Sequence, residues 1–236
     1  FRKHRFRNDQ NVWSIIVALT KYNFNSFDVT SAASTGLGFN ASANGFSTIS
    51  ATSMVLIKTL TASSSSTLSF VHGSSDVVLD STYPVYLFKF INIHPASDAV
   101  FFTFNASADS GSNYNVIKTN TYISSYHDEA DANTALGYQT GRDLAQSTAY
   151  SNLGDSVGAD NDQQISGYLH LFNPSSDTFV KHFLSNTNTA EGGNFSVNVY
   201  TAGYFNTTSA INSIDFKFAS GNIDAGTIKL YGIKDS

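Results

Sequence analysis

The sequence predicts an all-β protein: an antiparallel β-sandwich of jelly-roll type that carries an extended N-terminal arm. Two observations support this fold class. Several short segments alternate apolar and polar residues with a period of two, and turn-forming residues separate them. In addition, none of the 236 residues forms a long amphipathic helical pattern. The composition is 14% aromatic but only 13% charged, against about 25% charged in an average domain.

The clearest strand pattern lies at the C-terminus. Between Ile214 and Phe218, every second residue is apolar, and Asp215 and Lys217 alternate with them. Residues 227–233 repeat this alternation, which is typical of a strand with one buried face. Residues 219–226 between them contain two glycines and two turn-favouring polar residues. We therefore predict that residues 211–233 form an antiparallel hairpin.

Further strands follow from the same pattern along the rest of the chain. Residues 84–93 are apolar on both faces, which predicts a central strand covered on both sides. Proline-containing turns are expected at residues 94–98, before a returning strand, and at residues 173–177. The remaining predicted strands are residues 54–60, 67–71, 99–105, 114–123, 165–172, 178–184 and 195–204.

The chain divides into an arm and a body. Residues 1–50 are expected to form the extended arm, with one or two short strands, and residues 51–236 the β-sandwich domain. A long irregular insert at residues 126–162 interrupts the body and holds seven of the 18 carboxylates. Residues 136–150 are a candidate for a short helix, although Gly137 and Gly141 weaken it. Such excursions commonly carry function or form interfaces.

The charge distribution is uneven. The net charge is −5, and without Arg2, Lys3, Arg5 and Arg7 it becomes −9, so the chain as a whole is not built to bind nucleic acid. These four cations predict an arm that docks onto an acidic neighbour, with a solvated terminus as the alternative. The chain has no cysteine, and its N-terminal apolar run, residues 12–19, is too short to insert across a membrane, which takes roughly 20 residues.

The insert begins with a cluster of potential metal ligands. Asp128, Glu129 and Asp131 lie beside His127, and carboxylates of this kind bind Ca²⁺ or a transition metal. One short run supplies few of the oxygens that a hard cation requires, so a solvated acidic loop is the competing interpretation. Asp160 and Asp162 lack the glycine and glutamate spacing of an EF-hand. No cofactor is predicted.

Three tyrosines of the insert are candidates for contact with a sugar or a receptor. They are Tyr126, Tyr138 and Tyr150, whose ring faces could stack on a pyranose. With 12 tyrosines and 19 phenylalanines in the chain, buried or interface aromatics are the alternative interpretation.

The sequence shows no catalytic motif. It lacks a Gly-x-Ser-x-Gly elbow, a His-Glu-x-x-His pair, a P-loop and a dinucleotide-binding glycine pattern. With only two glutamates, a glycosidase would depend on aspartates. We predict a non-enzymatic protein with no catalytic residues, and keep a hydrolase using Asp128 and Asp143 as a third hypothesis.

Two segments resemble structural proteins of marine tailed bacteriophages. They are residues 92–112, with Asn92-Ile-His-Pro-Ala-Ser-Asp98 at their start, and residues 214–233, which contain Ser-Gly-Asn-Ile-Asp-Ala-Gly-Thr-Ile-Lys-Leu-Tyr-Gly-Ile233. The resemblance covers residues 54–233 and leaves residues 1–50 unmatched. It implies a non-enzymatic, oligomeric, jelly-roll-like component of a virion, used for head decoration, in the tail or in a fibre.

The expected partners follow from these observations. The leading hypothesis is a protein located in the virion that assembles with copies of itself and with other virion proteins through sandwich and arm contacts. The alternative is a carbohydrate-binding or receptor-binding module that uses the insert to recognise host surface glycans. Neither hypothesis involves nucleic acid or insertion into a membrane.

Overall fold

The computed structural model describes residues 35–39, 46–50 and 53–234, and the chain divides into two units, residues 1–52 and 53–236. In the first unit, β1 (Thr35–Phe39) and β2 (Phe46–Ser50) pair antiparallel, with Thr35 opposite Ser50. Both strands fall within the predicted arm. Its remaining residues, including Arg2, Lys3, Arg5 and Arg7, lie outside the described residues, and so does the predicted docking of these four cations.

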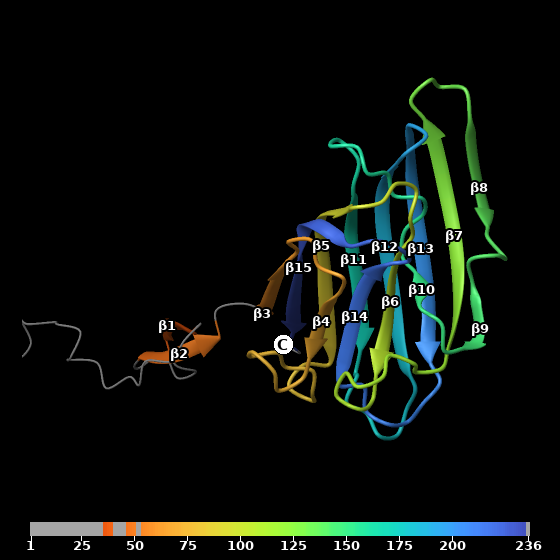
Figure 1. Cartoon of the computed structure of the whole chain (residues 1–236). Coiled ribbons are helices and arrows are strands. Elements are labelled where there is room, and N and C mark those ends of the chain that lie inside the picture. Colours follow the sequence, from red (N-terminus) through yellow and green to blue (C-terminus); the bar gives the residue numbers. More distant parts are fainter. Residues whose placement is uncertain (1–34, 40–45, 51–52, 235–236) are drawn as a thin grey trace, which may run out of the picture. The chain divides into compact units, whose positions relative to one another are not determined.

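The second unit consists of two packed antiparallel sheets (Figure 1), which confirms the predicted β-sandwich. The larger sheet contains, in spatial order, β3 (Met54–Thr61), β15 (Ile223–Ile233), β5 (Val85–Pro95), β11 (Ile165–Phe172), β12 (Lys181–Glu191), β13 (Phe195–Phe205), β7 (Lys118–Asp128) and β8 (Thr134–Tyr138), with β9 (Leu144–Ser147) also paired to β7. The smaller sheet contains β10 (Ser151–Asn152), β6 (Phe102–Ser107), β14 (Ser213–Phe218) and β4 (Leu68–Val71). The described residues form no helix.

Eight of these strands follow the order of a jelly roll. The set β3-β15-β5-β11 lies in the larger sheet, and the set β4-β14-β6-β10 forms the smaller one, so the chain alternates between the sheets in the way this fold requires. Two insertions add to the same side of the larger sheet: β7 to β9 precede β10 in the chain, and β12 and β13 follow β11. The larger sheet is therefore wider than the sheet that it packs against.

The predicted C-terminal hairpin is wrong in its pairing, although both strands exist. β14 pairs with β4 and β6, whereas β15 pairs with β3 and β5, so residues 219–222 cross from one sheet to the other. The same correction applies to residues 94–101, because β5 and β6 also lie in different sheets. An alternating pattern identifies a strand with a buried face but does not identify its neighbours, and a core between two sheets favours crossing over hairpins.

The predicted helix at residues 136–150 is also wrong. This segment contains β8 and β9, which pair with β7; Gly137 lies opposite Ser124. Pairing satisfies the edge of β7, which a helix would leave without partners. The turn at residues 173–177 is confirmed, since it lies between the paired strands β11 and β12. The prediction for β5 is confirmed in its central position, between β15 and β11, but not in its cover on both sides, because Ile91 on its outer face is 39% exposed.

The core between the sheets is aromatic and centres on Phe216 of β14. Its ring lies 5.2 Å from the rings of both Phe88 and Phe90 on the opposite sheet, measured between centroids. On its own sheet it stacks on Phe102 and lies 6.2 Å from Phe70. All five rings are at most 2% exposed. This cluster joins the two sheets by edge-to-face and stacked contacts.

Beyond the jelly-roll strands, the inner face of the larger sheet contains buried polar residues as well as apolar ones. The hydroxyls of Thr187 and Thr201 donate hydrogen bonds to the main-chain carbonyls of Leu153 and Asn152. The buried Lys118 ammonium donates to the carbonyl of Ala149, and burial lowers its pKa to about 8. Hydrogen bonds thus hold residues 149–153 over β12, β13 and β7. This attachment positions the rest of the insert above the widened part of the sheet.

We expect Phe216→Ala to lower the free energy of unfolding by about 3–5 kcal/mol, because it leaves a cavity among five buried rings. Urea unfolding followed by circular dichroism measures the change. Phe179→Ala is the control, since that ring is 70% exposed, and its effect should stay within about 0.5 kcal/mol. Equal effects of the two variants would contradict this account of the core.

Candidate functional site

A pocket of about 290 Å³ lies where the insert meets the widened sheet. Ser124 of β7 and Val197 of β13 belong to its lining, and the insert contributes Gln139, Arg142 and Asp155. The inward-facing positions of β7 and β13 provide one side because their side chains alternate across the sheet. The pocket therefore depends on the insert lying over these strands.

Two aromatic rings form an apolar wall of this pocket. Tyr126 of β7 lies opposite Val197 of β13, two residues from Phe195. The ring centroids of Tyr126 and Phe195 are 5.4 Å apart in a T-shaped arrangement, and both rings line the pocket. Tyr126 keeps part of its surface exposed. An aromatic edge and face of this kind can contact the apolar side of a small ligand.

Charged side chains also belong to the lining of this pocket. The Arg142 guanidinium is 3.2 Å from an Asp155 carboxylate oxygen, and its carbon lies 4.2 Å from the centre of the Phe101 ring. These two contacts orient the guanidinium while leaving further N–H donors. Glu191 accepts a hydrogen bond from the Gly193 N–H and also lines the pocket.

Two buried hydroxyl groups beside the pocket have no hydrogen-bond partner among the described residues. They are the phenol of Tyr122 and the hydroxyl of Thr189, both 0% exposed. Burial raises the pKa of Tyr122, the charge of Asp155 raises it further, and Arg142 opposes this effect. The phenol therefore remains a protonated donor. A buried donor without a partner is costly, and neither hydroxyl belongs to the lining of the pocket.

The structure does not bring the three predicted tyrosines together. Tyr126 lines the pocket, but Tyr138 lies opposite the outward-facing Ile123, on the other face of the sheet, and donates to Asp143 at 2.6 Å. Tyr150 lies against the smaller sheet, where its hydroxyl donates to Asp215 at 2.9 Å and its ring lies under Lys217. The three do not form one sugar platform.

The predicted metal ligands lie beside a neighbouring hollow of about 400 Å³. The Asp128 carboxylate accepts hydrogen bonds from the main chain and side chain of Asn133 and from the Ala132 N–H, and these bonds lower its pKa. Asp131 lies 3.0 Å from His127, and Glu129 lines the same hollow. Asp128 thus caps a turn. Within residues 53–234, no three histidine, cysteine or acidic side chains are grouped to hold a metal ion.

Sequence reasoning missed most of the pocket. Arg142, Asp155 and Glu191 are scattered charges in a charge-poor chain, and Tyr122 sits inside an ordinary strand alternation. The small number of charged residues was the one available signal for this site. Because Arg142 is the one arginine of the insert, it is expected to pair with a carboxylate. Its partner, 13 positions along the chain, follows only from the fold.

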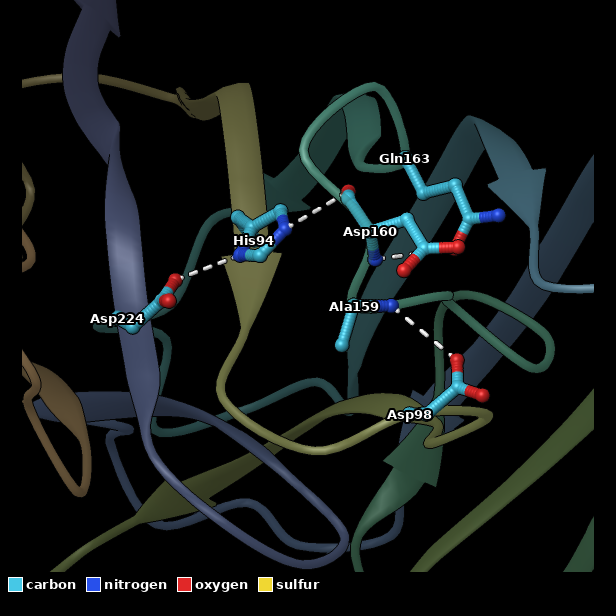
Figure 2. A network of polar contacts seen from close by, with 6 residues as sticks. All are labelled: His94, Asp98, Ala159, Asp160, Gln163 and Asp224. Atoms are coloured by element: carbon cyan, nitrogen blue, oxygen red, sulfur yellow. Dashed lines mark hydrogen bonds and ion pairs between the residues drawn. The ribbon is translucent and has the colours of Figure 1, made fainter.

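A second polar network fastens the end of the insert to the sandwich (Figure 2). The His94 Nδ1 atom is 2.7 Å from an Asp224 carboxylate oxygen, and its Nε2 atom is 3.1 Å from the Asp160 carbonyl oxygen. Nearby, Asp98 accepts a hydrogen bond from the Ala159 N–H at 3.2 Å. Both ring nitrogens of His94 face acceptors, so only the protonated imidazolium donates to both.

This geometry makes the network dependent on pH. Burial acts to lower the pKa of His94, but the hydrogen bonds to Asp224 and Asp160, together with the charge of Asp224, outweigh it and raise the pKa above its ordinary value. The stabilisation is thus fully present below the unfolded pKa of about 6.5 and is lost as the pH rises through the folded pKa.

We expect His94→Gln to lower the free energy of unfolding more at pH 5.5 than at pH 8.5, as measured by urea unfolding of both proteins at each pH. His127→Gln is the matched control, because the pair of His127 with Asp131 is exposed and is screened by solvent. A His94→Gln effect that is the same at both pH values would show that the imidazolium does not hold the insert.

Residues 53–234 contain no helix that is long and apolar enough to cross a membrane. Comparison of the chain with protein-family models, with curated proteins and with solved structures finds no match. The chemistry of the site therefore carries the functional argument.

Proposed function

We propose that the protein is a non-enzymatic structural component of a virion that assembles with copies of itself and with other virion proteins. Three observations support this proposal: the jelly-roll strand order, the low charge of the chain, and the resemblance of residues 92–112 and 214–233 to phage structural proteins. The observation that carries the assembly argument is the outer edge of β3.

β3 forms one edge of the larger sheet. Among the described strands it pairs with β15 alone. Over residues 55–61 this edge has a single charge, Lys58, and Leu56 is 51% exposed. Natural sheets usually block an edge of this length with charges, prolines or bulges, because open backbone groups pair with other chains. β3 has Lys58 and one irregularity in its pairing with β15, between Leu56 and Lys58, and the rest of its edge has neither. The edge of β3 is suited to accept a strand from a neighbouring subunit.

We expect Leu56→Lys to reduce the oligomeric mass of the full chain, because a lysine on an edge strand opposes strand pairing. Size-exclusion chromatography with light scattering measures the mass. Leu184→Lys is the matched control: Leu184 is 49% exposed, but it lies on β12 inside the sheet.

The masses of the two variants decide whether the chain assembles through the edge of β3. A loss of mass in Leu56→Lys alone supports pairing through β3. A wild-type chain that stays monomeric at high concentration, or a loss of mass caused equally by Leu184→Lys, contradicts it. Localisation of the protein on purified particles by labelled antibody and electron microscopy tests the virion assignment separately.

A second function, binding of a carbohydrate or a receptor group, is favoured by the pocket beneath the insert. The specific observation is the aromatic wall of Tyr126 and Phe195 in the same lining as the oriented guanidinium of Arg142. A sugar ring combines an apolar face with many hydroxyls, and this combination matches such a lining. The pocket volume limits the ligand to one or two sugar units.

We expect Arg142→Ala and Tyr126→Ala to abolish binding of a mono- or disaccharide found on a glycan array, because they remove a donor and half of the aromatic wall. Titration calorimetry measures the affinity. Tyr204→Ala, on the other face of the sheet, is the control. Binding that survives both pocket variants, or an array without any ligand, would remove this second function.

A further inference from the structure

One row of side chains crosses the outer face of the larger sheet in register. Cross-strand neighbours in antiparallel pairs share a face, and successive pairings place seven residues in line: Lys229, Lys89, Tyr168, Asn186, Tyr200, Ile123 and Tyr138. Phe88, Leu169 and Val199, which adjoin this row in sequence, are buried in the inner layers. The row therefore points away from the sandwich.

Three tyrosines recur along this row at every second strand. Tyr168, Tyr200 and Tyr138 are 40%, 56% and 49% exposed. Strands lie about 4.8 Å apart, so successive tyrosines are about 10 Å apart. Two of the rings are held in place: Tyr168 packs edge-on against His170 at 5.2 Å, and the hydroxyl of Tyr138 donates to Asp143. The row is an ordered aromatic strip.

The residues of the row itself are neutral or positive, although the Asp143 carboxylate accepts the hydrogen bond of Tyr138 at one end. Asn186, between Tyr168 and Tyr200, donates through its amide nitrogen to Asn198 at 3.1 Å, and its amide oxygen remains an acceptor site. At the end of the row, Lys89 and Lys229 lie directly opposite each other, and neither takes part in an ion pair among residues 53–234. Like charges in this position destabilise a sheet, so the pair favours an anionic group.

We propose that this strip binds an extended acidic polysaccharide that runs across the strands. The tyrosines lie on alternate strands, about 10 Å apart, so separate sugars of one extended glycan chain stack on the three rings. A carboxylate or sulfate of the chain lies at Lys89 and Lys229. Two lysines in a chain of net charge −5 are too few to hold nucleic acid. Tyr200, Ile123 and Tyr138 form an apolar half of the row, and Asn186 with the two lysines forms a polar half, so a ligand that spans the row needs apolar faces together with acceptor and anionic groups.

The strip is separate from the pocket and from the edge of β3. The pocket opens on the inner side of the sheet, and the row ends at Lys229 of β15, the strand next to β3, without including a residue of the β3 edge. Different variants therefore test the glycan proposal and the assembly proposal. Tyr138 belongs to this strip because it shares the outer face with Ile123, whereas Tyr126 lies on the inner face.

Affinity electrophoresis of the full chain tests this inference. The gels contain alginate, polygalacturonate or carrageenan as acidic polymers, and hydroxyethyl cellulose as the neutral one. We expect retardation by at least one acidic polymer, and about tenfold weaker binding by Tyr200→Ala and by Lys89→Gln. Tyr204→Ala is the control, because it removes a tyrosine from the same face of β13 outside the row. Circular dichroism and thermal melting confirm that each variant is folded.

Retardation by an acidic polymer that both row variants weaken and the control does not supports the proposal. Three outcomes overturn it: no retardation by any acidic polymer, equal retardation in the neutral gel, and a Tyr204→Ala effect as large as that of Tyr200→Ala. Because the edge of β3 is intact in these variants, their oligomeric mass should equal that of the wild type, which keeps this test apart from that of assembly.

Discussion

The contact between the two sheets through Phe216 is the interaction on which the rest of the structure depends. Its ring touches aromatic rings of β4, β5 and β6, and it therefore fixes how the sheets face each other. The order of the eight jelly-roll strands satisfies this contact, because the chain must alternate between the sheets to bury the inward residues of each. The crossings of residues 94–101 and 219–222 follow from this requirement.

The widened part of the larger sheet obeys a different constraint. The inward face of β7 and β13 combines buried apolar residues, such as Phe205 and Val199, with buried polar ones, such as Lys118 and Thr201. Main-chain carbonyls of residues 149–153 satisfy several of these polar groups. Because hydrogen bonds leave more room than interlocked aromatic rings, this region holds a pocket while the jelly-roll core is filled.

Three surfaces of the domain are chemically distinct. The edge of β3 offers backbone groups with little charge, the pocket offers an oriented guanidinium and an aromatic wall, and the outer face offers tyrosines at a regular spacing. These surfaces can be used together, since none of them shares a residue with another. A structural subunit that also holds a glycan is consistent with this separation.

The sequence by itself determined the fold class and most strand positions. Alternation of apolar and polar residues with a period of two depends only on the chain's own geometry, so it identified β5, β11, β13 and both C-terminal strands. It also marked Tyr126, which lines the pocket.

Only the tertiary structure decided which strands pair and which side chains meet. β14 and β15 have the pattern of a hairpin, yet packing of the core separates them into different sheets. Arg142 meets Asp155, and Tyr168, Tyr200 and Tyr138 align, because strands distant in sequence lie side by side in a given register. Register is set by the sum of all pairings and by burial of one face, which no local segment encodes.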